Sequence, residues 1–205
     1  MTLPVFPELH FDEDKHLYTL DQQGITLELP SVTQILRFVS QELYAGIPQY
    51  NMNHAADRGT RVHAAIELSN NFIPVENDEE TEPYVFAYEE WEKGYGFKTI
   101  ASEYRIYHRT RLYAGTADGI YMDGDDLILI DNKTTSRVLV ELTTAQLYGY
   151  AEALKSHGVD IKQSYILHLR NNATYDFIPV DTSKGQTMFN ACAYLHGAIK
   201  GKGIS

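Results

Sequence analysis

The feature that most constrains the fold is a run of four apolar residues at 127–130 that ends abruptly in Asp131-Asn132-Lys133. A continuous apolar run between polar segments is typical of a strand buried on both faces of a sheet. Two alternating runs precede it at 98–108 and 112–122, and Asp123-Gly124 supplies a tight turn into it. These residues predict a three-stranded meander at the centre of a sheet.

Further strands and helices are predicted on either side of this meander. The alternating runs 16–20 and 25–29 flank a turn at 21–24, which indicates an N-terminal β-hairpin. Ser31 and Gln34 form a capping box before a helix through 35–39. Helices are also expected at 53–69, 84–93 and 144–156, and a final helix is expected after Asp181, which can cap it. Strands are expected at 162–169 and 175–180. Residues 70–82 are expected to form an exposed acidic loop. The fold class is α/β or α+β, with one central mixed sheet flanked by helices.

Length and composition favour one domain over residues 1–205. The chain shows no repeats and no convincing linker, so the hairpin and first helix, about 8–45, are expected to join a main body at about 53–200. No segment approaches the roughly 20 apolar residues of a membrane span. Residues 1–7 lack the pattern of a signal peptide, so a cytoplasmic protein is expected.

The single cysteine, Cys192, excludes disulfide frameworks, thiolate zinc sites and four-cysteine iron–sulfur clusters. Any metal must therefore be held by oxygen and imidazole ligands. The net charge is −11, but residues 76–92 alone carry eight carboxylates and no Lys or Arg. Without that segment 17 basic residues face 20 acidic ones, so the acidic total does not exclude a nucleic-acid substrate.

Carboxylates at the ends of neighbouring strands are the strongest sign of chemistry. Asp118 lies in a Gly-Thr-Ala-Asp-Gly motif, and Asp131 and Lys133 project from one face of the buried strand. If the turn at 123–124 pairs these strands, Asp118 approaches Asp131, and two close carboxylates favour a cation such as Mg²⁺ or Mn²⁺. Lys133 could then orient or deprotonate the attacking water. The plainer alternative is a surface Asp–Lys pair at the end of a strand.

Two helical motifs offer further candidates. His63 follows Gly59 by four residues and precedes Glu67 on the same helix face, where the imidazole could join a metal site. Gln146 and Tyr150 are also four residues apart, and neutral donors of this kind suit phosphate or sugar oxygens. A structural histidine and the wet edge of an amphipathic helix are the alternatives.

The first strand of the meander combines acidic, basic and aromatic side chains. Glu103 could add a carboxylate to the same site. Arg105, Arg109 and nearby tyrosines form a basic-aromatic cluster, which suits a nucleic-acid backbone with stacked bases. The same mixture also suits an exposed strand edge protected by charge.

The order of these motifs resembles that of the RecB-like branch of the PD-(D/E)XK nuclease superfamily, and in particular its phage and prophage exonucleases. The order is Gly-x-x-x-His, then Glu, Gly-Thr-Ala-Asp-Gly, an apolar strand with Asp-x-Lys-Thr, and Gln-x-x-x-Tyr. A Pro-Ser-Val-Thr segment at 30–33 precedes these motifs. The resemblance as a whole covers most of the chain, from about residue 16 to 153. The first acidic motif reads Ala-Asp where the family often has Pro-Asp, which leaves the ligand intact.

The resemblance implies a restriction-endonuclease-like core and a role for each motif residue. His63, Asp118, Asp131 and the main-chain carbonyl of Asn132 would be the metal ligands, and Lys133 the catalytic lysine. Glu103 matches an acidic position on the first core strand, and the implied substrate-binding residues are Gln146, Tyr150, Arg61, Arg105 and Arg109. No iron–sulfur cluster is implied, because its cysteines are absent.

The implied activity is Mg²⁺- or Mn²⁺-dependent hydrolysis of DNA, most simply by an exonuclease that leaves 5′-phosphates and serves phage recombination, replication or repair. Partners would be DNA and an annealing protein or a helicase. Rival readings are a structure-specific endonuclease, a nuclease-fold protein that binds without cutting, and an unrelated domain with a coincidental motif order. Strand polarity, strand preference, the number of metals and the oligomeric state stay open.

Overall fold

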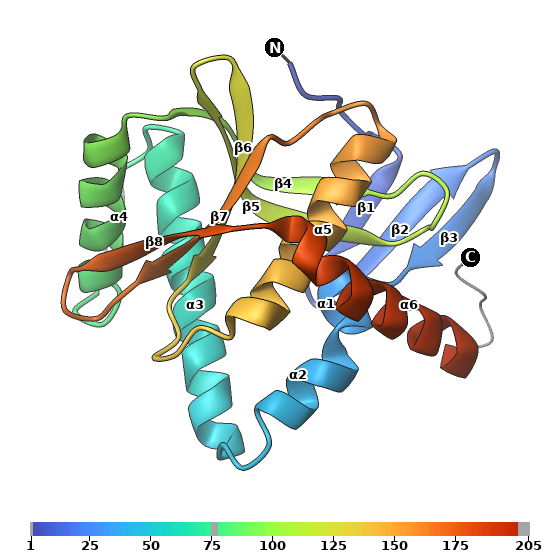
Figure 1. Cartoon of the computed structure of the whole chain (residues 1–205), viewed down its shortest axis with the longest axis horizontal. Coiled ribbons are helices and arrows are strands. Elements are labelled where there is room, and N and C mark those ends of the chain that lie inside the picture. Colours follow the sequence, from blue (N-terminus) through green and yellow to red (C-terminus); the bar gives the residue numbers. More distant parts are fainter. Residues whose placement is uncertain (1, 75–77, 201–205) are drawn as a thin grey trace.

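A five-stranded mixed sheet forms the centre of the molecule, which is described here from a computed structural model that covers residues 2–74 and 78–200. The strands lie in the order β4 (Lys98–Tyr107), β5 (Ala114–Asp123), β6 (Asp126–Lys133), β7 (Gln163–Leu169) and β8 (Tyr175–Val180). All neighbours are antiparallel except β6 and β7, which are parallel. The predicted meander and the predicted mixed sheet are therefore confirmed (Figure 1).

Helices cover both faces of this sheet, and each face has its own apolar core. On one face pack α1 (Val32–Ile35), α5 (Val140–Ser156) and α6 (Gln186–Lys200). On the other pack α3 (Gln49–Asn70) and α4 (Glu82–Tyr95), with Trp91 at the centre of an aromatic cluster. The buried run Leu127 to Ile130 alternates between these two cores, which explains why all four residues are apolar.

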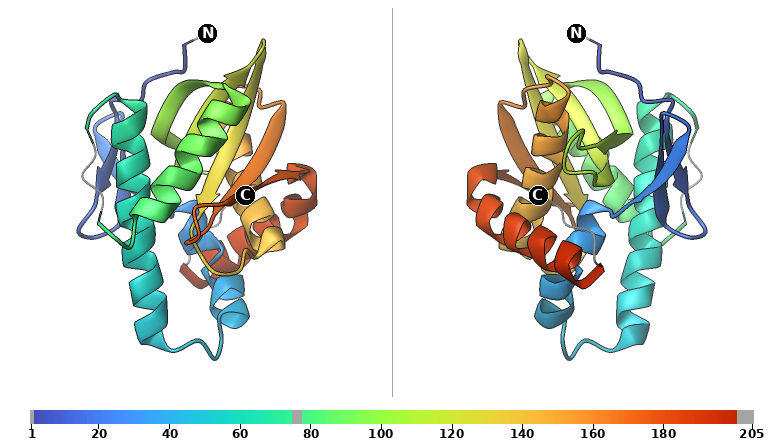
Figure 2. Two further views of the ribbon diagram at one scale, coloured as in Figure 1. Left: turned by 90° about the vertical axis from the view of Figure 1, so that its left-hand side faces the viewer. Right: turned by 90° about the vertical axis from the view of Figure 1, so that its right-hand side faces the viewer.

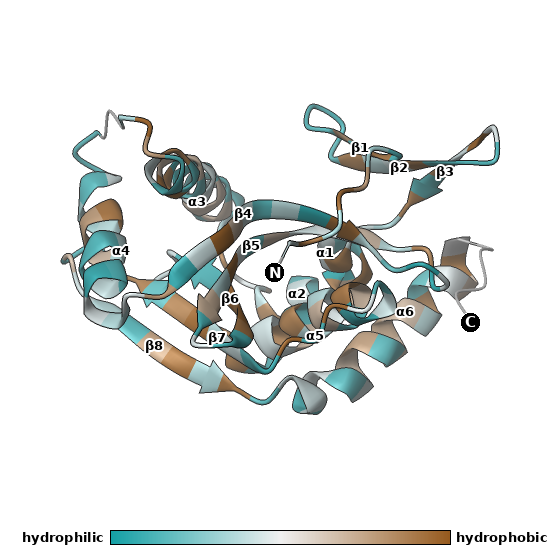
Figure 3. Ribbon diagram, turned by 90° about the horizontal axis from the view of Figure 1, so that it is seen from above, coloured by the Kyte–Doolittle hydropathy of each residue, from teal (hydrophilic) through white to brown (hydrophobic). Residues whose placement is uncertain are grey.

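The N-terminal hairpin belongs to a separate three-stranded sheet. β2 (Leu17–Gln22) and β3 (Ile25–Leu29) form the predicted hairpin, and β1 (Leu9–Asp12), which the sequence did not indicate, pairs along the other edge of β2. This sheet lies beside the end of the central sheet, as Figure 3 shows, and packs there on Tyr107 and Ala114. It is joined to the main body, so the protein is a single α+β domain.

Several helix boundaries differ from the predicted ones. α3 and α5 each begin four residues earlier than expected, because their N-caps, Pro48 and Leu139, offer no capping side chain to mark the start. The predicted capping box at Ser31 and Gln34 is present, but the helix after it breaks at Leu36 into α1 and α2 (Arg37–Leu43). Asp181 caps the 3₁₀ helix η1 (Thr182–Gly185) rather than the final α-helix.

The acidic loop predicted at 70–82 lies partly outside the described residues, which omit 75–77. Its described end, 78–80, precedes α4, which begins at Glu82, two residues earlier than expected. α2 and the N-terminal half of α3 project beyond the rest of the molecule (Figures 1 and 2). No helix in the ranges that the structure covers is long and apolar enough to cross a membrane.

The central sheet forks between β5 and β6. Their pairing ends at Gly119 and Ile130, whereas β5 stays paired with β4 as far as Ala114, and β6 stays paired with β7 as far as Lys133. The two inner strands therefore part just before Asp118 and Asp131. The backbone of each strand must find other hydrogen-bond partners beyond this point.

The contact between α5 and η1 gives a prediction about stability. A Cβ atom at Gly185 would lie 2.5–2.7 Å from backbone atoms of Thr144 and Ala145, which cannot move aside as a side chain can. Gly185→Ala should therefore lower the free energy of unfolding by about 1–3 kcal/mol or more. Gly94→Ala is the matched control: the new methyl group meets Tyr175 at 3.6 Å, and it should raise stability by up to about 1 kcal/mol in a helix. Urea denaturation of both variants checks this, and equal stabilities would contradict it.

Candidate metal centre

Asp118 bridges the fork of the sheet. Its Oδ2 accepts the main-chain N–H of Asn132 at 2.7 Å, so a side chain replaces the ladder hydrogen bond that the parting strands no longer make. Asp118 is 8% exposed, and the bond fixes one carboxylate oxygen while the other stays available. The position of this carboxylate is therefore set by the topology of the sheet.

A group of three possible ligands surrounds Asp118. His63 from α3, Glu103 from β4 and Asp118 from β5 present ligand atoms that all lie within 4.8 Å of one another. His63 Nδ1 lies 3.1 Å from Glu103 Oε1 and 3.7 Å from Asp118 Oδ1, and its Nε2 lies 3.2 Å from the main-chain oxygen of Asn132. The structure thus brings His63, Glu103, Asp118 and the Asn132 carbonyl together.

Glu103 reaches this group through an unusual backbone conformation. Its φ is +48°, a left-handed value that a non-glycine residue rarely adopts, least of all within a strand. Such strain costs on the order of 1–3 kcal/mol and is concentrated in proteins at functional sites. The sheet therefore tolerates a local cost at the position that directs a carboxylate towards His63.

This strain predicts that, at position 103, glycine gives a more stable protein than alanine, which reverses the usual order of stability in a strand. In an ordinary strand alanine is the more stable of the two, but Glu103→Gly should be more stable than Glu103→Ala by about 1 kcal/mol. Both variants remove the carboxylate, so their difference isolates the backbone term. Thermal unfolding of the metal-free proteins measures it. Alanine as the more stable variant would show that the backbone at this position is relaxed.

Asp131 lies across from this group with Lys133. Asp131 is 1% exposed, and Lys133 Nζ lies 2.6 Å from its Oδ2 in an ion pair. Lys133 also donates to Gln146 Oε1 at 3.4 Å, and Gln146 Nε2 donates to Tyr150 OH at 3.2 Å. A line of polar groups thus runs from β6 to α5 along one side of the site.

Tyr150 approaches the opposite branch of the fork. A Cβ atom at Gly115 would lie 2.6 Å from a ring carbon of Tyr150, so the tyrosine can occupy this place only against a glycine. The first glycine of the Gly-Thr-Ala-Asp-Gly motif is therefore explained by packing against Tyr150.

The buried charges shift one another's pKa. Burial alone would lower the pKa of His63, but Asp118 and Glu103 outweigh it and raise the pKa to about 9. The imidazole is therefore protonated at neutral pH in the metal-free protein. The charge of the protonated imidazole offsets the negative charges of the Asp118 and Glu103 carboxylates.

Both aspartates are less acidic than usual, mainly because they are buried. Burial raises the pKa of Asp131 to about 6 despite the nearby Lys133 ammonium, and it raises the pKa of Asp118 as well. For Lys133, burial acts to lower the pKa, but Asp131 and Asp118 outweigh it and raise the pKa. A cation placed among these carboxylates would stabilise their ionised forms.

The residues present fit a hard divalent cation. The donors are carboxylate, carbonyl and imidazole atoms, a set that suits Mg²⁺ or Mn²⁺. Asp131 Oδ1 is buried without a hydrogen-bond partner, which leaves acceptor capacity that a cation or its water would fill. Three carboxylates face one ammonium and one imidazole, so the site has an excess of negative charge when the imidazole is neutral.

The three arginines named in the sequence analysis are not part of this group. Arg61 pairs with Asp57, Asp78 and Glu80. Arg105 lies over the Phe11 ring, 5.4 Å from its centroid, and 3.5 Å from Glu13 of the N-terminal segment. Arg109 is exposed beyond the end of β4, six residues from Glu103 and thus about 20 Å along an extended chain.

Three residues that the sequence analysis did not single out support the site. Tyr18 of β2 is buried and shares a 2.7 Å hydrogen bond with Thr116, two residues before Asp118. Arg58 donates to the carbonyl of Thr134 at 3.1 Å, and His168 lies 2.7 Å from the carbonyl of Thr135. Each comes from a different element, so no local spacing in the sequence signals them.

Comparisons with known proteins give low similarity. No protein-family model matches the chain, and no curated protein matches it significantly. Among solved structures, SSO0001 is 14% identical with a TM-score of 0.42, covering 86% of this chain and 78% of that one.

Two structures of LHK-Exo, an alkaline exonuclease from Laribacter hongkongensis, also match. One, in complex with dAMP, is 11% identical with a TM-score of 0.39 and covers 84% of this chain and 88% of that one. The other is 13% identical with a TM-score of 0.37 and covers 84% and 90%.

Proposed function

We propose that the protein is a divalent-metal-dependent nuclease that hydrolyses phosphodiester bonds of DNA, of the PD-(D/E)XK type and its RecB-like branch. The observation that carries this proposal is the meeting of His63, Glu103, Asp118 and the Asp131–Lys133 pair at the fork of the sheet. Four separate elements supply these groups, so their meeting is not a consequence of sequence proximity. A carboxylate-rich site with a buried lysine suits phosphoryl transfer, which needs mainly positioning and charge.

Each residue has a role in this proposal. His63, Glu103, Asp118, Asp131 and the Asn132 carbonyl would hold Mg²⁺ or Mn²⁺, which neutralises phosphate charge and makes bound water a better nucleophile. Lys133 orients the attacking water and offsets charge on the phosphate. Gln146 holds the Lys133 ammonium and Tyr150 in one line, so both can donate to phosphate oxygens.

The finer features of the proposal concern product and context. We infer an exonuclease that leaves 5′-phosphates and acts in the cytoplasm in phage or prophage recombination, replication or repair. DNA is the proposed partner, with an annealing protein or a helicase beside it. These features rest on the motif order of the chain.

The test is incubation with end-labelled linear DNA and with closed circular DNA, each with Mg²⁺, Mn²⁺ or chelator. Cutting of linear DNA alone, dependent on metal, is the expected result, and chromatographic identification of the released nucleotides as nucleoside 5′-monophosphates would reveal the 5′-phosphates. Cutting of circles would indicate an endonuclease. Tight DNA binding without cutting in any metal would indicate a nuclease-fold protein that binds DNA but does not hydrolyse it.

A further inference from the structure

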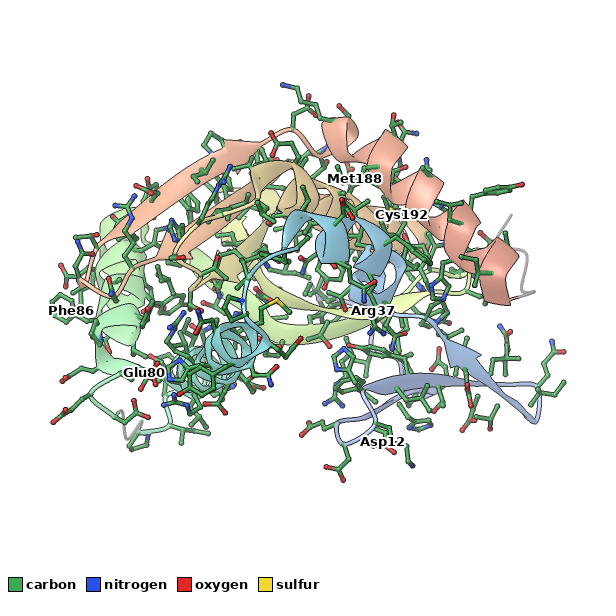
Figure 4. All side chains as sticks on the ribbon, turned by 90° about the horizontal axis from the view of Figure 1, so that it is seen from below. Asp12, Arg37, Glu80, Phe86, Met188 and Cys192 are labelled. Atoms are coloured by element: carbon green, nitrogen blue, oxygen red, sulfur yellow. The ribbon has the colours of Figure 1, made fainter. Side chains whose placement is uncertain are left out.

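One face of α3 outside the metal centre carries a row of basic side chains. His54, Arg58 and Arg61 are spaced four and then three residues apart, which places them on one side of the helix. A single carboxylate, Glu80, contacts all three: Oε2 lies 2.6 Å from Arg61, and Oε1 lies 3.5 Å from His54 and 3.7 Å from Arg58. Figure 4 shows Glu80 beside α3, seen nearly along its axis.

The loop that carries Glu80 does not need this carboxylate for its conformation. Asp78 Oδ1 accepts the main-chain N–H groups of Glu80 and Thr81 at 3.0 and 2.8 Å, which fixes the turn before α4. The side chain of Glu80, by contrast, is hydrogen-bonded to Arg61 and otherwise lies near His54 and Arg58, so within the described part of the chain its side-chain partners are all on α3. Its role is therefore in charge pairing and not in the turn.

Arg58 connects this basic row to the metal centre. Its side chain is 16% exposed and lies over the Tyr84 ring, and its Nη2 donates to the carbonyl of Thr134, the residue after Lys133. Arg58 Nε is buried without an acceptor. Arg58 thus ties the basic row to the backbone one residue beyond Lys133.

One carboxylate held by two guanidinium groups and an imidazole has the charge and the acceptor geometry of a phosphate. The pKa of the Arg61 guanidinium is raised, chiefly by its hydrogen bond to Glu80 and also by Asp78 and Asp57. Next to the row, Tyr50 is 77% exposed with its ring 6.2 Å from that of His54, which adds a surface for base stacking.

We propose that His54, Arg58 and Arg61 form a binding site for a backbone phosphate of the nucleic acid, and that Glu80 occupies this site until the substrate displaces it. The inference rests on the proposed nuclease function and adds a contact outside the metal centre. It also gives the acidic loop a role: competition by Glu80 suppresses non-specific binding, so that DNA also engaged at the metal centre is favoured.

The test compares Glu80→Gln with Glu79→Gln. Both remove one negative charge from the same loop, but Glu79 is exposed and makes no described contact with the basic row. Binding of fluorescent 30-nucleotide single- and double-stranded DNA is measured by anisotropy in chelator, where no cutting occurs. Glu80→Gln should bind about tenfold more tightly than the parent with a salt slope steeper by about one, and Glu79→Gln should change affinity less than about twofold.

A double variant separates phosphate binding from a general charge effect. Adding Arg61→Gln to Glu80→Gln should return the affinity to the parental level or below it, with unchanged unfolding temperature as the check on folding. Equal DNA affinities of the Glu80 and Glu79 variants would overturn the proposed phosphate site, and so would a double variant that binds DNA as tightly as Glu80→Gln. Neither result would overturn the proposed nuclease function, because the parent would still bind and cut DNA. Absence of DNA binding by every protein would overturn the proposed nuclease function as well.

Discussion

Lys133→Ala is expected to reduce DNA hydrolysis by at least about 10²- to 10³-fold while binding of Mn²⁺ is largely spared. The lysine is not one of the oxygen or imidazole ligands, so the metal group His63, Glu103 and Asp118 stays intact. What is lost is the ammonium that offsets charge on the phosphate, and removal of one such preorganised group has an effect of this size. Single-turnover cleavage and calorimetric Mn²⁺ titration measure the two properties separately.

The same substitution has an expected signature in stability. Without Lys133, Asp131 is left as a buried carboxylate with no ionic partner, which costs about 3–5 kcal/mol. If Mn²⁺ binding is spared, Mn²⁺ should stabilise the variant as much as the parent, so the unfolding temperature should fall by a similar amount in chelator and in metal. Lys155→Ala, which removes an exposed lysine of α5, is the control and should change neither property. Cleavage by Lys133→Ala at the parental rate would remove Lys133 from the proposed chemistry.

Asp118→Asn is expected to abolish both cutting and metal-dependent stabilisation. The amide oxygen of asparagine can still accept the Asn132 N–H, so the bridge across the fork is kept and only the charge is removed. At a Mn²⁺ concentration 100 times the Kd, the parent should gain about 2.7 kcal/mol of stability, and the variant should gain close to none.

The metal-free variant should be as stable as the parent or more so. Burial raises the pKa of Asp118, which means that the folded state disfavours its ionised form above the unfolded pKa, and a neutral amide removes this penalty. Asp123→Asn, the same change at the exposed end of β5, is the control and should cut normally. Metal-dependent stabilisation of Asp118→Asn equal to that of the parent would exclude Asp118 as a ligand.

The sequence predicted the parts of the fold that depend on local pattern. The apolar run at 127–130, the turn at 123–124 and the alternation of the flanking strands were enough to predict the meander, and the capping box at Ser31 is present. β1 was missed because a strand of four residues, LHFD, has too little alternation to stand out. The early starts of α3 and α5 were missed because neither has a capping side chain.

The site was predictable only as a set of separate motifs. The turn at 123–124 made Asp118 and Asp131 neighbours in advance, since the register of a hairpin follows from its turn. Nothing local indicated that pairing would stop at Gly119 and Ile130, that Glu103 would adopt a positive φ, or that Arg61 would be held by Glu80. Each of these depends on contacts between residues far apart in the chain.

The fork has a consequence for when the protein can become active during its synthesis. One branch, β4 with β5, is complete once residue 123 has been made, whereas the other needs β7, which ends at Leu169. The β5–β6 hairpin brings Asp118 beside Asp131 once residue 133 has been made, but β6 then still lacks its second neighbour, and Lys133 lacks its partner Gln146 of α5. Under the proposed function, a ribosome-bound chain that stops before β7 should therefore not hydrolyse DNA, and hydrolysis should arise only with the nearly finished polypeptide.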